Sequence, residues 1–98
     1  MKEDMDTQNL LKIIDDIDSY EKYFGIIPIS VVYSKVKEIL HLSINEFHEL
    51  LLNLEKEQVI YLEVINDINR LPIEEKNIAI YDNVRGYLYY IGRWKQQP

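Results

Sequence analysis

Polar and charged side chains with a helical spacing lie between residues 43 and 57. Asn45, Glu49, Asn53 and Lys56 follow one another at intervals of four or three, which places them on one face of a helix. Amide groups can hydrogen-bond to adenine edges in a major groove, and a lysine can neutralise a phosphate. The same segment carries one lysine against four glutamates, and carboxylates repel the phosphate backbone. The face therefore indicates recognition of DNA or of a basic protein, with an ordinary solvated surface as the third alternative.

The C-terminal segment, residues 83–98, is basic in an otherwise acidic chain. It carries Arg85, Arg93 and Lys95 and no acidic residue, whereas the whole chain has a net charge of −6. Arg85 precedes Gly86 in a turn-forming stretch, and an arginine at the tip of a β-hairpin can contact phosphate. We therefore predict DNA contacts for these cations. Solvation of a turn and a terminal strand is the alternative.

Groups suited to catalysis or metal binding are sparse. The chain has no cysteine, two histidines and three glycines. His41 and His48 lack the spacing of a metal motif, and Asp15, Asp16 and Asp18 lack that of a calcium loop. The sequence contains no nucleophile–base motif and no glycine-rich phosphate loop. We therefore expect no enzyme, no metal site and no cofactor.

Aromatic side chains gather in the second half of the chain: Tyr61, Tyr87, Tyr89, Tyr90 and Trp94. They could form a stacking platform for single-stranded nucleic acid. Packing in the core or against a partner is the favoured alternative, because aromatic pairs commonly stabilise neighbouring strands. Strict alternation places Tyr87, Tyr89 and Ile91 on one face of a strand, and Leu88 and Tyr90 on the other.

Asn45, Glu49 and Asn53 belong to a helix that is predicted over residues 43–57. Ser43-Ile44-Asn45-Glu46 has the form of a capping box, in which the serine hydroxyl and the glutamate carboxylate each accept a backbone N–H. Its apolar face consists of Ile44, Phe47, Leu50, Leu51 and Leu54. Residues 59–65 then become β-branched and aromatic, which predicts a buried strand.

Two further helices are predicted before this one. The first begins at an Asp6 or Thr7 cap and runs to about Phe24, with Gly25 as its C-terminal stop. The second covers residues 31–41 and begins at a Ser30 cap, and a short edge strand over residues 26–29 precedes it. The predicted inward side chains are Leu10, Ile13, Ile14, Ile17 and Phe24 in the first helix and Val32, Val36, Ile39 and Leu40 in the second.

The two main strands are joined by about twenty residues, which is long for a hairpin loop. A turn over residues 66–69 leads to a short helix within residues 70–77, where Pro72 precedes acidic residues suited to a first turn. A brief extended piece over 78–81, a turn over 82–86 and a last strand over 87–91 follow.

Several of these segments resemble the winged helix-turn-helix superfamily, and in particular a group of small prokaryotic winged-helix domains. The segments are Pro28-Ile29 before two helices, Ser43 with Glu46-Phe47 before a leucine-rich stretch, Leu71-Pro72-Ile73-Glu74-Glu75, and Gly86-Tyr87-Leu88-Tyr89-Tyr90-Ile91. The resemblance covers about residues 26–94. It implies an α+β winged helix, with three helices and a small antiparallel ribbon whose wing is elaborated. Many members bind DNA through the helix equivalent to residues 43–57 and the wing, and others are protein-interaction modules.

Length and composition predict a single domain over residues 1–98, with residues 26–94 as the winged-helix core. Residues 1–25 would supply an additional helix for a homodimer, and the apolar faces of the strands offer a second dimer surface. No apolar run is long enough to span a membrane, the first residues do not form a signal peptide, and cysteine is absent, so we expect a cytoplasmic protein. The function predicted is that of a DNA-binding transcriptional regulator. The alternative is an acidic interaction module that binds a basic protein or completes a larger complex without touching DNA.

Overall fold

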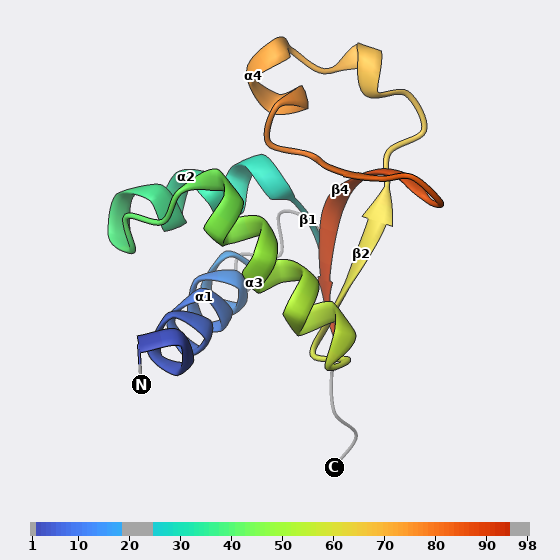
Figure 1. The fold of residues 1–98 in the computed structure, drawn as a ribbon. Helices are drawn as coiled ribbons and strands as arrows, with labels where there is room; N and C mark the ends of the chain where they lie inside the picture. Colours follow the sequence, from blue (N-terminus) through green and yellow to red (C-terminus); the bar gives the residue numbers. More distant parts are fainter. Residues whose placement is uncertain (1, 19–24, 95–98) are drawn as a thin grey trace.

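The computed structural model describes residues 2–18 and 25–94, with side chains from Met5 onward. These residues form an α+β structure, as predicted (Figure 1). The elements are α1 (Lys2–Asp18), β1 (Ile26–Pro28), α2 (Ile29–Ile39), α3 (Ile44–Lys56), β2 (Ile60–Val64), the 3-10 helix η1 (Ile68–Arg70), α4 (Ile73–Lys76), β3 (Ile80–Asp82) and β4 (Gly86–Arg93).

The last strand, β4, is the centre of the sheet. It pairs with β2 along one edge, and with both β1 and β3 along the other, and every pairing is antiparallel. Ile27 and Leu62 both lie opposite Ile91, so the three side chains share one face of the sheet. β1 is thus an edge strand, as the proline within it predicts.

The helices α1, α2 and α3 pack on the same face of this sheet (Figure 1). Their apolar faces and the inner face of the sheet share one core, in which Phe47 is fully buried and its ring centroid lies 5.1 Å from that of Tyr33. The other fully buried large side chains are Leu10, Ile14, Ile27, Ile29, Val32, Val36, Leu51, Leu54, Ile60, Leu88 and Ile91. The predicted facing of α3 is therefore confirmed.

The β2–β4 register contains an irregularity that changes the facing of β4. Glu63 lies opposite Tyr90, but Val64 lies opposite Leu88, so Tyr89 has no partner in β2. Such an extra residue breaks the alternation of side chains. As a result Leu88 and Ile91 both face the core, and the prediction that strict alternation places them on opposite faces is wrong.

Two of the predicted helix starts need correction. α1 already begins at Lys2, ahead of the predicted cap at Asp6 or Thr7. α2 begins at Ile29 after Pro28, whose φ of −59° suits a helix entry, so Ser30 lies inside the helix and is not its cap. The predicted end of the first helix near Phe24 lies outside the described residues. Ile39, predicted to face inward, is 57% exposed.

The segment between β2 and β3 projects from the end of the sheet (Figure 1). It contains η1 and α4, and Pro72 directly precedes α4, as predicted. His48 of α3 anchors it, because its Nε2 lies 2.7 Å from the carbonyl oxygen of Ile78. The turn between β3 and β4 follows at residues 83–85. No helix in the described part of the chain is long and apolar enough to cross a membrane.

Candidate interaction surface

The outer face of α3 is fixed by the cap at its start and by the core residues beneath it. The Ser43 hydroxyl accepts the N–H of Glu46 at 3.2 Å, and the Glu46 carboxylate accepts the N–H of Ser43 at 3.0 Å, so the capping box is confirmed. This cap determines where the helix begins, and the burial of Phe47, Leu51 and Leu54 determines which side faces the core. All the predicted recognition side chains of the helix are exposed: Asn45, Glu49, Asn53 and Lys56.

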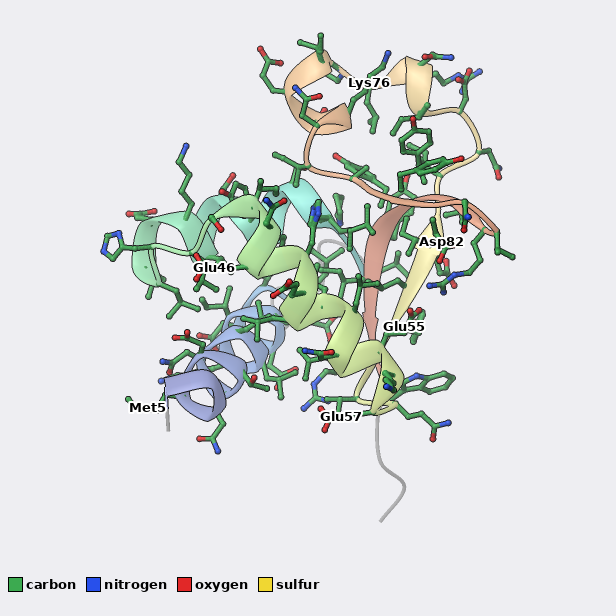
Figure 2. All side chains as sticks on the ribbon, viewed as in Figure 1. Met5, Glu46, Glu55, Glu57, Lys76 and Asp82 are labelled. Atoms are coloured by element: carbon green, nitrogen blue, oxygen red, sulfur yellow. The ribbon has the colours of Figure 1, made fainter. Side chains whose placement is uncertain are left out.

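A groove of about 600 Å³ runs between the start of α1 and the outer face of α3. Its apolar lining consists of Leu42, Leu50 and Leu54. Its polar and charged lining consists of Asp6, Thr7, Glu46, Glu49, Asn53, Lys56 and Glu57. In Figure 2, Glu46 and Glu57 mark the two ends of α3, and Met5 marks the beginning of α1. The sequence indicated the acidic face of α3. It gave no sign that α1 would lie beside this face and form a groove with it.

Arg85, the predicted phosphate contact at the hairpin turn, is bound to Glu55 of α3. Two guanidinium nitrogens, Nη1 and Nη2, each lie 2.8 Å from a different carboxylate oxygen of Glu55. The Nε of Arg85 lies 3.4 Å from Asp82, at the end of β3. Two-point arginine–carboxylate contacts are among the stronger ion pairs because both hydrogen bonds are charge-assisted. Arg85 therefore connects the β3–β4 turn to α3 through this ion pair.

The surrounding hydrogen bonds favour the charged forms of all three groups. The side-chain hydrogen bond from Arg85 lowers the pKa of Glu55, and the N–H of Leu62 contributes to the same effect. The backbone N–H groups of Arg85 and Val84 lower the pKa of Asp82. The pKa of Arg85 is raised by its hydrogen bond to Glu55. Sequence reasoning missed Glu55, and its separation of 30 positions from Arg85 left no local signal of the pairing.

Arg93 is also engaged within the chain. Its Nε donates to Asp15 of α1 at 3.1 Å, and its Nη1 donates to the carbonyl oxygen of Val59 at 3.0 Å. The arginine thus joins the end of β4 to the first helix and to the residue before β2. Lys95 lies outside the described residues. The basic character of residues 83–98 is therefore offset, at both described arginines, by carboxylates from elsewhere in the chain.

No protein-family model, curated protein or solved structure matches this chain.

The aromatic side chains divide between the core and the outer face of the sheet. Tyr89 is 3% exposed and does not present a ring face for stacking. On the outer face, Tyr81 and Tyr87 are cross-strand partners with ring centroids 5.1 Å apart, and Tyr61 meets Trp94 edge-on at 5.0 Å. Of the predicted set, Tyr89 thus packs in the core, while packing of the exposed Tyr87 and Trp94 against a partner stays a prediction. The homodimer expected through this face or through α1 stays a prediction.

Two histidines and the aspartates of α1 are the side chains considered above as possible metal ligands. His48 contacts the backbone of Ile78, whereas His41 is exposed beyond the end of α2. Asp15 is paired with Arg93. Within the described residues, no group of three or more histidine, aspartate or glutamate side chains is arranged to hold a metal ion.

Proposed function

We propose that this chain is a winged-helix domain that acts as an acidic protein-interaction module, with α3 as its binding helix and a basic protein surface as its partner. The order of its elements supports the winged helix. Three helices lie on one face of the sheet, and β4 lies between β1 and β2. The segment from β2 to β4, with α4 and β3 inserted, corresponds to an elaborated wing.

The bond between Arg85 and Glu55 is the observation that carries the choice of partner. Non-specific DNA binding relies on cations that can neutralise phosphates. At the turn beside α3 the cation is already neutralised by two hydrogen bonds of 2.8 Å, and Asp82 adds a second carboxylate. A phosphate would have to displace Glu55 and leave its carboxylate facing the phosphate backbone.

The charge of the α3 surface supports the same choice. The described side chains that line the groove beside α3 include four carboxylates and one lysine. A surface of this sign attracts cationic partners and slows the approach of phosphates. The chain as a whole carries a net charge of −6, so long-range forces act in the same direction.

The test compares two labelled probes by fluorescence anisotropy: a random-sequence DNA duplex and a short lysine-rich peptide. At about 50 mM salt we expect the peptide to bind and the duplex not to bind, and we expect peptide binding to weaken at about 200 mM salt because it is electrostatic. A duplex that binds at the lower salt and is released at the higher one would overturn the proposal.

DNA binding is the second candidate function, because α3 stands exposed beside the wing and displays Asn45, Asn53 and Lys56. It requires Arg85 to leave Glu55. The substitution Glu55→Gln, which weakens that pair, would then increase duplex affinity, and Arg85→Met would decrease it for all sequences. Under the interaction function, neither substitution creates duplex binding.

A further inference from the structure

We propose that the groove between α1 and α3 binds a short basic peptide segment, which places an apolar side chain on the groove floor between lysine or arginine side chains. This inference rests on the proposed function, and it assigns the binding site and the chemistry of the partner.

The floor of the groove is suited to an apolar side chain. Leu54 is 2% exposed and Leu42 is 7% exposed, so each presents only a small area to the groove, and half-buried Leu50 completes its apolar lining. A volume of about 600 Å³ is within the range of pockets that hold a small ligand. An aliphatic side chain placed here would exchange water for leucine contacts, which is favourable.

The rim determines the charge of the occupant. Asp6 comes from α1, and Glu49 and Glu57 come from the α3 side, so carboxylates border the groove on both sides. Among the side chains that the structure describes, Lys56 is the one cation in the lining, and Glu46 raises the carboxylates to four. An acidic peptide or a nucleic acid would meet this excess of negative charge directly. A segment with lysine or arginine on either side of its apolar residue matches it.

The acidic lining continues past the end of α3 toward the only tryptophan in the chain. Glu57 also lines a neighbouring hollow, together with Asp15, Asp18, Arg93 and Trp94. Trp94 is 54% exposed, and an exposed indole attracts a lysine or arginine through its ring face. A basic segment that extends beyond the groove would therefore reach Trp94, whose fluorescence provides a signal from an unlabelled peptide.

The experiment uses a labelled peptide of lysines around a central pair of leucines, titrated with the whole chain at about 50 mM salt. The groove variant is Glu49→Gln with Glu57→Gln. The matched control is Glu38→Gln with Glu74→Gln, which removes the same charge from exposed positions on α2 and α4, outside the groove lining. We expect the groove variant to weaken peptide binding about tenfold, because it removes two ion pairs at the rim whose free energies add. The control should bind the peptide with the affinity of the wild type.

A second pair of measurements tests the floor and the geometry. A peptide with serines in place of the leucines should bind more weakly than the first one, because the floor contacts are lost. Asn53→Lys adds a cation at an exposed position of the lining and should also weaken binding without affecting the core. Thermal unfolding of each variant, followed by circular dichroism, confirms that the fold is retained.

The outcomes separate this inference from the proposed function. If the groove and control variants lose affinity equally, binding depends on net charge and the groove is not the site, although an acidic interaction module remains. If the peptide binds all variants as it binds the wild type, the groove is again excluded. If the wild type does not bind the lysine peptide at the lower salt, both this inference and the proposed function are overturned.

Discussion

The hydroxyl of Tyr89 in β4 lies 2.8 Å from the hydroxyl of Ser30 in α2, across 59 positions of the chain. One oxygen of Glu75 lies 3.1 Å from the Tyr89 hydroxyl and 3.2 Å from the Ser30 hydroxyl, so the three oxygens share the two hydroxyl protons. Glu75 belongs to α4, so this cluster, which is buried at Ser30 and Tyr89, ties the long β2–β3 segment to the sheet and to a helix of the core. Tyr89 reaches it from the irregular position in β4, where it has no partner in β2.

Tyr89→Phe removes one member of this cluster and keeps the ring. We expect a loss of about 1–2 kcal/mol in the free energy of unfolding, because buried polar groups lose a hydrogen-bond partner. Urea denaturation measures the loss. Tyr81→Phe is the matched control, since that side chain is 64% exposed and its hydroxyl is accessible to water in the folded and the unfolded chain. Equal effects of the two substitutions would mean that the cluster contributes nothing measurable.

Alkaline pH should weaken the same cluster. Burial raises the pKa of Tyr89, and the Glu75 carboxylate acts in the same direction. A neutral phenol with a raised folded pKa contributes its full stability below the unfolded value of about 10, and that contribution is lost as the pH rises through the folded value. We therefore expect the stability difference between wild type and Tyr89→Phe to shrink above about pH 10. A stability difference that stays constant above about pH 10 would mean that ionisation of Tyr89 does not affect the cluster.

The sequence predicted what local patterns control. The cap at Ser43, the apolar face of α3 and the short helix after Pro72 depend on neighbouring residues, and each appears in the structure. The contact between Ser30 and Tyr89 could not be predicted in this way, because the two residues are 59 positions apart and the extra residue in β4 depends on its pairing with β2.

In the candidate site, too, local features were predictable and tertiary contacts were not. The exposure of Asn45, Glu49, Asn53 and Lys56 was predictable from helical spacing. The partners of Arg85 and Arg93 were not, because Glu55 and Asp15 approach them only through the tertiary fold. Local charge counts along a sequence therefore overestimated the cations available on this surface.

Arg85→Met should lower the free energy of unfolding by about 0.5–1 kcal/mol, the range for ion pairs near a surface. Arg70→Met is the control, because Arg70 is 86% exposed and lies 3.8 Å from Asp67. We expect the control to have no measurable effect in the same urea titration. A similar loss from both would mean that the two-point contact to Glu55 adds nothing.

Acid should remove the contribution of Arg85. The pKa of Glu55 is lowered in the folded chain, chiefly by the hydrogen bond from Arg85, so its stabilising effect is full above the unfolded value and is lost as the pH falls through the folded value. The stability difference between wild type and Arg85→Met should therefore be constant near neutral pH and shrink below about pH 4. A difference that is independent of pH would show that packing of the arginine stem, and not its charge, is responsible.

Gln58→Gly should stabilise the chain by about 0.5–1 kcal/mol. Gln58 follows α3 with a φ of 63°, and the N–H of Val59 bonds back to Leu54 at 2.9 Å, the arrangement of a glycine-type helix end. Gln58→Ala is the control, because alanine keeps the backbone strain. The gain should appear for glycine alone in thermal unfolding, and an equal gain for alanine would point to an effect of the glutamine side chain.

Gly92→Ala should displace the ring of Tyr61 from the outer face of the sheet. The two residues are cross-strand partners, and a Cβ at position 92 would overlap the ring. We expect a loss of about 1–3 kcal/mol, as for other insertions into packed sites. The emission of Trp94 should change as well, because the ring of Tyr61 meets it edge-on. The decisive measurement is a double-mutant cycle: once Tyr61→Ala has removed the ring, adding Gly92→Ala should cost little, because the obstruction is gone. Strictly additive losses would instead mean that the glycine is required by the backbone of β4 and not by the ring above it.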